Sequence, residues 1–213
     1  MVYHGTPKDK AEKIIYEKCF NESKGDRHWL GDGVYFYRDL FYAVRWIRCL
    51  DKNRTSNLFE NYSILAVELN VDKERIFSFF NPEHKLLFYS VLEACNEKMK
   101  SLNLKNEIVD GVILNIMFKK MKYGNDYDMI EAAFIHEDKK MGNFNSRLCY
   151  FPEIQFCVKN DEIIEKIHRL EIDLEDISEQ IPIIDDFSTK ISGVLMSKNM
   201  NYAMKKKNKR YKS

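Results

Sequence analysis

Two kinds of short apolar pattern alternate along this 213-residue chain, and that alternation constrains the fold more than any other feature. Segments that alternate, or that are rich in β-branched and aromatic residues, predict strands; segments whose apolar residues recur every three or four positions predict helices. The expected strands are 2–4, 33–37, 63–70, 129–135 and 154–159, and the expected helices are 8–18, 39–50 and 84–102. Because strands and helices follow without a regular βαβ alternation, we expect an α+β fold.

Three local features leave room for interpretation. Residues 107–123 are typical of a helix, although their apolar centre at 109–116 also suits a strand. Residues 163–174 fit either element, since their apolar residues alternate only near the end. Thr6 has the side chain of a helix cap, and Pro7 suits the first turn of the helix that follows.

Size and composition indicate a folded protein of one domain, or one domain with appendages. No apolar run approaches the length of a membrane span, and the N-terminus lacks the pattern of a signal peptide, so we expect a cytoplasmic protein without a membrane partner. The five cysteines contain no CxxC pair, and we expect most of them to be buried. The histidines form no spaced cluster, so no metal site is expected.

The character of the chain changes near residue 174. We expect one domain at 1–174 and a C-terminal extension at 175–213, where acidic residues and Pro182 precede a basic tail. That tail holds six of the 34 lysines and arginines within residues 205–212. Such a tail can contact nucleic acid, or it can be a solvated end.

The first fifty residues gather side chains suited to a flat cationic ring and a sugar. His4 offers an imidazole beside Gly5, whose backbone a ligand can approach closely. Tyr35 and Trp46 lie eleven residues apart, so a strand that leads into a helix can turn both toward one cleft. Two aromatic faces can then hold a ring between them, with about 1–2 kcal/mol from the cation–π interaction when desolvated. The same residues are also typical of a core.

The order of these motifs resembles the ADP-ribosyltransferase superfamily, in its poly(ADP-ribose) polymerase-like, diphtheria-toxin-related branch. The motifs are Tyr3-His4-Gly5-Thr6, Trp29-Leu30-Gly31-Asp32-Gly33-Val34-Tyr35-Phe36, and Ala43 with Trp46. The resemblance is specific over residues 3–46 and weaker beyond them. It implies a split mixed β-sheet with flanking helices, and NAD as a substrate that is consumed.

The resemblance also implies a role for each matching residue. His4 would bind a ribose hydroxyl, and the Gly5 backbone would bind the carboxamide of nicotinamide. Tyr35 and Trp46 would stack on the nicotinamide ring, and Thr6 and Ala43 would line the pocket. The family often has a small hydroxyl residue where this chain has Ala43, so one contact to the amide would be missing.

The family's remaining element is a glutamate on a late strand, which stabilises positive charge as the glycosidic bond breaks. Glu153 in Phe151-Pro152-Glu153-Ile154-Gln155 is the first candidate, and an alternative register places Gln155 there. Glu137 is a third candidate and Glu131 a fourth. Glu153 can also be read as a surface acid at a strand edge.

The loop 21–29 lies where the family's adenosine and phosphates run. Arg27 in this loop can pair with a diphosphate, and a solvated loop is an equal alternative.

These observations predict an enzyme that breaks the nicotinamide–ribose bond of NAD and transfers ADP-ribose to a protein or nucleic-acid acceptor. A bacterial toxin or defence effector with an antitoxin or regulatory partner fits this prediction. The alternative is an inactive module that binds NAD or ADP-ribose. A third interpretation, an interaction protein with a chance match, is favoured if His4, Tyr35 and Trp46 do not converge on one cleft.

Overall fold

The computed structural model describes residues 1–25, 28–51, 58–103, 109–134 and 152–172. Nearly all of them belong to one compact unit, formed by Met1–Phe134 and Glu153–Leu170. The account below concerns this unit. The extension expected at 175–213 lies outside the described residues.

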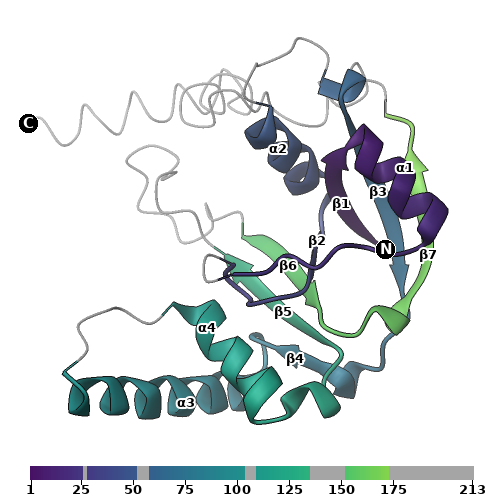
Figure 1. Ribbon diagram of the computed structural model, residues 1–213. Coiled ribbons are helices and arrows are strands. Elements are labelled where there is room, and N and C mark those ends of the chain that lie inside the picture. Colours follow the sequence, from purple (N-terminus) through teal and green to yellow (C-terminus); the bar gives the residue numbers. More distant parts are fainter. Residues whose placement is uncertain (26–27, 52–57, 104–108, 135–151, 173–213) are drawn as a thin grey trace, which may run out of the picture. The chain divides into compact units, whose positions relative to one another are not determined.

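A seven-stranded mixed sheet forms the centre of the unit (Figure 1). Its strand order is β4-β5-β6-β2-β1-β3-β7, and of the pairs between these strands only β4 and β5 run parallel. The bounds are β1 Val2–Pro7, β2 Val34–Tyr37, β3 Tyr62–Leu69, β4 Ile76–Ser78, β5 Met129–Phe134, β6 Glu153–Val158 and β7 Ile164–Leu170. The middle of the sheet therefore places β6, β2 and β1 side by side, although they come from opposite ends of the sequence.

Helix α1 (Lys8–Glu17) covers one face of the sheet. Its Ala11 and Ile14 pack with Val2, Phe36 and other residues of that face in one hydrophobic core. Because side chains alternate between faces along a strand, the neighbouring residues Gly5, Tyr35 and Cys157 belong to the opposite face. That opposite face carries the remaining helices.

Helix α2 (Leu40–Leu50) lies over β1, and α3 (Pro82–Ser101) and α4 (Asp110–Asn115) lie toward β4 and β5 (Figure 1). A π-helical turn, Ile116–Lys120, continues α4. A second hydrophobic core joins α3, α4 and the sheet through Phe88, Ile113, Ile130 and their neighbours. The two helical groups thus cover different parts of one face.

The helix ends follow local sequence. Asn81 caps α3 by accepting a hydrogen bond from the Glu83 N–H, and Pro82 occupies its first turn. At α1, however, the expected cap is wrong: Pro7 is the N-cap residue and no side chain caps the helix. Thr6 instead ends up buried within β1, where it pairs with Ser63.

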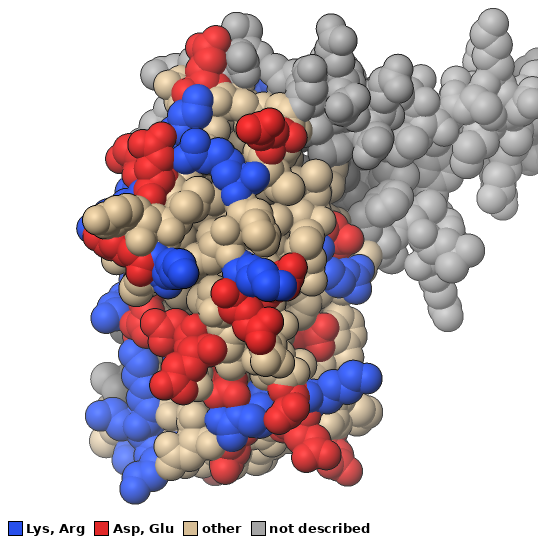
Figure 2. All heavy atoms as spheres, turned by 90° about the vertical axis from the view of Figure 1, so that its right-hand side faces the viewer, with Lys and Arg blue, Asp and Glu red and all other residues tan. Residues whose placement is uncertain are grey.

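The edge strand β7 is rich in charged residues, a common device against pairing with another chain. Lys166 pairs with Glu68 at 2.6 Å, and Arg169 with Glu12 at 3.6 Å. On the face that carries β7 and α1, acidic and basic side chains intermingle (Figure 2). This face therefore presents no continuous basic surface.

The structure confirms the α+β class and every strand and helix expected from a clear pattern, within a residue or two at their ends, except that β1 runs three residues beyond the expected 2–4. It resolves residues 109–116 mainly as helix and 164–170 as strand. The expectation that most cysteines are buried is wrong for the described residues, since Cys19 and Cys49 are exposed and only Cys157 is buried. Among the described helices, none has the length and apolar character needed to cross a membrane.

Candidate functional site

The segments that carry the sequence motifs meet at the centre of the sheet. Tyr3 of β1 pairs with Tyr37 of β2, and Tyr37 pairs on its other side with Gln155 of β6. Residues that face each other in antiparallel strands point to the same face of the sheet. Tyr35, Tyr37, Glu153 and Gln155 therefore share the face that α2 partly covers.

Glu153 lies at the centre of this arrangement. It begins β6, an interior strand between β5 and β2, and only 4% of its surface is exposed. The interpretation of Glu153 as a surface acid at a strand edge is therefore wrong. Its Oε2 accepts a hydrogen bond from Arg45 Nη1 of α2 at 2.9 Å, and its Oε1 accepts one from Gln155 Nε2. We call Arg45, Glu153 and Gln155 the carboxylate clamp.

Two tyrosines share the environment of the carboxylate clamp. Burial raises the pKa of Tyr37 and of Tyr42, and the negative charge of Glu153 raises both further. Both hydroxyls therefore keep their protons at neutral pH. They add polar character around the carboxylate without adding a second negative charge.

Trp46 belongs to α2, the helix that covers β1, but it is not among the buried residues of this helix. On the same helix, Ala43 and Ile47 cover Gly5 so closely that a Cβ on Gly5 would stand 2.6 Å from the Ala43 carbonyl oxygen. With 3.6 residues per turn, Trp46 lies on the helix surface between the side that carries Ala43 and Ile47 and the position of Arg45. The guanidinium of Arg45 forms an ion pair with Glu153 of β6. Trp46 keeps 44% of its surface exposed.

The hydroxyl of Tyr35 is anchored to the turn that precedes β2. It donates to the Gly31 carbonyl at 2.6 Å and accepts from the Leu30 N–H at 3.0 Å. Burial raises the pKa of this hydroxyl, so it stays protonated. The His28 ring lies 5.7 Å from the half-buried Tyr35 ring, tilted by 40°. Tyr35 is thus held by its hydroxyl, and its ring packs against the second hydrophobic core.

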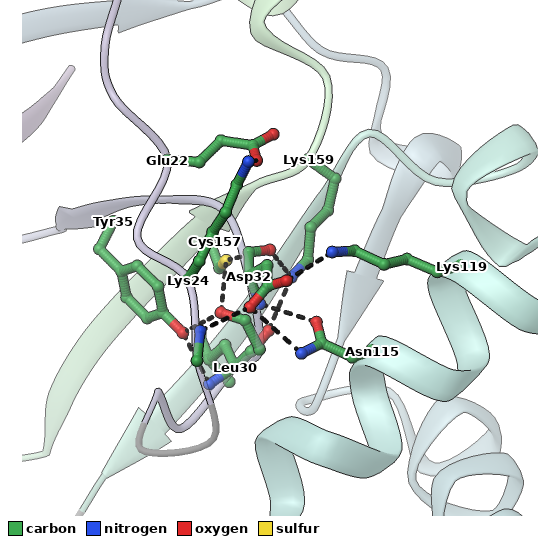
Figure 3. A network of polar contacts seen from close by, with 11 residues as sticks. Glu22, Lys24, Leu30, Asp32, Tyr35, Asn115, Lys119, Cys157 and Lys159 are labelled. Atoms are coloured by element: carbon green, nitrogen blue, oxygen red, sulfur yellow. Dashed lines mark hydrogen bonds and ion pairs between the residues drawn. The ribbon is translucent and has the colours of Figure 1, made fainter.

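The Gly31-Asp32-Gly33 turn is fixed by a polar network (Figure 3). Asp32 accepts from the Gly25 N–H at 3.0 Å and from Asn115 Nδ2 at 3.2 Å, and it forms an ion pair with Lys119. Lys159, just beyond β6, donates to the carbonyls of Leu30 and Asp32 at 2.7 and 2.5 Å. We call Asp32, Asn115, Lys119 and Lys159 the turn network.

The turn network accounts for the glycines and the acid of this motif. Gly31 has φ of +74°, and a Cβ there would stand 2.6 Å from Asn115 Oδ1. Burial opposes ionisation of Asp32, but the hydrogen bonds from Lys119, Gly25 and Asn115 outweigh it and lower the pKa of Asp32 to about 2. This acid therefore holds the turn in place.

His4 lies where β1 meets β2. Its Nδ1 is 2.8 Å from the carbonyl oxygen of Tyr35, and its ring packs edge-on against Phe20 and Phe36. Phe36 lies on the α1 face, so the His4 ring leaves the sheet on the face opposite to the Tyr35 side chain. The side chains of His4, Tyr35 and Trp46 therefore do not converge on one cleft. This is the outcome that favours the third interpretation, an interaction protein with a chance match.

The remaining candidates from the sequence are Glu131, Glu137 and Arg27. Glu131 of β5 pairs with Phe156, so it lies on the face opposite to Glu153, and it accepts a hydrogen bond from the Ser78 hydroxyl at 2.9 Å. Arg27 and Glu137 lie outside the described residues. Sequence reasoning missed Arg45 and Lys159, because neither follows a recognisable spacing and each acts on a residue more than a hundred positions away.

Chemically, the carboxylate clamp offers a fixed negative charge beside an aromatic helix face. Such a charge can stabilise a cation that is held against the face. The ion pair between Arg45 and Glu153 joins β6 to α2, the helix that carries Trp46.

Comparison with known proteins identifies a relative without naming a function. No family model matches the chain, and no solved structure matches it significantly. The chain is 37% identical over 182 residues to a protein described as uncharacterized protein MJ0359, from Methanocaldococcus jannaschii. The similarity covers 78% of this chain and 85% of the relative. The chain therefore belongs to the same family as MJ0359.

Proposed function

We propose that this protein is an ADP-ribosyltransferase, which cleaves the nicotinamide–ribose bond of NAD⁺ and transfers ADP-ribose to a macromolecular acceptor. One observation carries the proposal. The sequence segments that resemble this superfamily, far apart in the chain, lie on the neighbouring strands β1, β2 and β6. Glu153 is buried there, on the face of Tyr35 and beneath α2.

The sheet also favours the split form that the resemblance implies. Strands β1 and β2 share one residue pair, Tyr3 with Tyr37, whereas β1 and β3 share six. Beyond that pair, the His4 side chain links β1 to the backbone of β2. Gly5 beside this junction is itself covered by Ala43 and Ile47 of α2.

The hydrogen bond between His4 and the Tyr35 carbonyl has a defined direction. A carbonyl oxygen can only accept, so Nδ1 of His4 must donate the hydrogen bond to Tyr35. Burial lowers the pKa of His4, which favours the neutral ring at pH 7. Nε2 then carries a lone pair, but it lies on the α1 face beside Phe20 and Phe36, so His4 takes no part in the reaction proposed on the Tyr35 face.

The proposed reaction uses these groups in sequence. Tyr35 and Trp46 hold the nicotinamide ring, and Glu153 stabilises the positive charge that develops on the ribose as the C1′–N1 bond breaks. Nicotinamide leaves with the bonding electron pair. An acceptor oxygen or nitrogen then forms the new bond to C1′ and releases its proton to solvent. The products are ADP-ribosylated acceptor, nicotinamide and a proton.

A second candidate is binding of NAD⁺ or ADP-ribose without turnover. The observation that favours it is the ion pair between Arg45 and Glu153, which already offsets the charge on which the reaction depends. Both candidates require affinity for NAD⁺. They differ in whether nicotinamide is released.

The test is to incubate the purified protein with cell lysate and NAD⁺ labelled in its adenylate part, and to measure nicotinamide release. We expect release together with label in macromolecules, and separating protein from nucleic acid identifies the acceptor class. Calorimetric binding of NAD⁺ without release would favour the second candidate. Folded protein that shows neither binding nor release would overturn both.

A further inference from the structure

We propose that Arg45 and Gln155 are positioning residues, which fix the Glu153 carboxylate in the orientation that the proposed reaction needs. This inference rests on the proposed transferase function. It assigns a role to two side chains that form no part of the sequence motifs in β1 and β2. It also favours Glu153 over Gln155 as the group that acts on the ribose.

The geometry of the carboxylate clamp supports this division of roles. Arg45 donates to one carboxylate oxygen and Gln155 to the other, so rotation of the carboxylate would break a hydrogen bond on each side. The side chains of Arg45 and Glu153 are only 18% and 5% exposed. In such a place water does not readily replace a lost donor, and hydrogen bonds to a charged group are stronger than neutral ones.

Gln155 follows Glu153 by two residues and therefore lies on the same face of β6. Its amide nitrogen points to the carboxylate. A neutral amide engaged in this way supplies no negative charge to a developing cation.

Arg45 also connects the carboxylate to the aromatic part of the site. It precedes Trp46 on α2, and its ion pair joins that helix to the start of β6. Loss of the guanidinium would free both the helix and the carboxylate at this point. Small displacements of a catalytic group are enough to slow a reaction substantially.

The experiment measures kcat and KM for NAD⁺ in three variants of the full chain. Arg45→Met removes the donor and keeps the aliphatic stem, Arg45→Lys keeps a positive donor, and Arg169→Met is a matched control in the β7 ion pair with Glu12. Circular dichroism and unfolding midpoints give the folded fraction, and rates are expressed per folded molecule. Arg45→Met removes the guanidinium from a buried carboxylate, and this loss can unfold the variant. Arg45→Lys therefore provides a second, milder test.

We expect Arg45→Met to lower kcat roughly 10- to 100-fold with little change in KM, and Arg45→Lys to recover part of the loss. Arg169→Met should leave both constants unchanged. Full kcat in Arg45→Met, or a loss that appears in KM alone, would overturn the positioning role while the transferase function stands. A folded wild-type protein that releases no nicotinamide would overturn the proposed function, and this role with it.

Discussion

The two ends of β6 carry polar clusters that use similar groups in different ways. Beyond its C-terminal end, Lys159 of the turn network donates to backbone carbonyls, and Asp32 is held by a backbone N–H, an amide and a lysine. At its N-terminal end, Glu153 of the carboxylate clamp accepts hydrogen bonds from the side chains of Arg45 and Gln155. One cluster fixes the course of the chain, and the other fixes a charge.

This difference separates an acid that belongs to a motif from the acid to which we assign a chemical role. Asp32 stands in the most recognisable stretch of the sequence, yet its contacts serve the turn before β2. Glu153 stands in an unremarkable stretch, yet it lies next to the motif strands and beneath the helix of Trp46. A motif can therefore position a site whose reactive group comes from elsewhere in the chain.

Replacing Lys159 should have the largest effect on stability. Lys159→Met keeps the aliphatic stem but removes the ammonium, which donates to two carbonyls and lies over the Phe118 ring, and this should lower the free energy of unfolding by about 2–4 kcal/mol. Urea unfolding measures this change. Lys166→Met, in the exposed pair with Glu68, is the matched control and should cost clearly less stability, because solvent screens an exposed ion pair. Equal losses in the two variants would mean that the turn network does not stabilise the fold.

A smaller effect should appear as a dependence of stability on pH. The folded pKa of Asp32, about 2, lies below its ordinary value of 3.8, so its contribution is fully present above pH 4. This contribution, about 2 kcal/mol, should be lost as the pH falls from 4 toward 2. The difference in unfolding free energy between the wild type and Asp32→Asn should therefore shrink over that range. A difference that stays constant with pH would contradict the assignment of Asp32 to the turn network.

The fold class and most elements could be predicted because each depends on local pattern. Ala43, Val44 and Ile47 recur at helical spacing and are buried in α2. The turn before β2 was visible in Gly31 and Gly33. The order of the strands was not visible, because the pairing of β2 with β6 joins residues more than a hundred positions apart.

The candidate site was only partly predictable for the same reason. Sequence alone indicated Tyr35, Trp46 and Glu153, and the structure brings these onto one face of the sheet. The sequence did not indicate that the His4 ring would pack against Phe20 and Phe36 on the other face of the sheet. A one-residue shift in a strand reverses the direction of a side chain, and the sequence does not fix that register. Arg45 escaped notice because a charged residue on an amphipathic helix is usually solvated.

The central claim is that Glu153, among the acids near the middle of the sheet, stabilises charge during cleavage of NAD⁺. The most direct measurement compares nicotinamide release at saturating NAD⁺ by Glu153→Gln and Glu131→Gln, which make the same substitution on neighbouring strands but on opposite faces. With both variants folded, we predict that release falls at least about 100-fold in Glu153→Gln and is retained in Glu131→Gln. Full activity in Glu153→Gln would contradict the account.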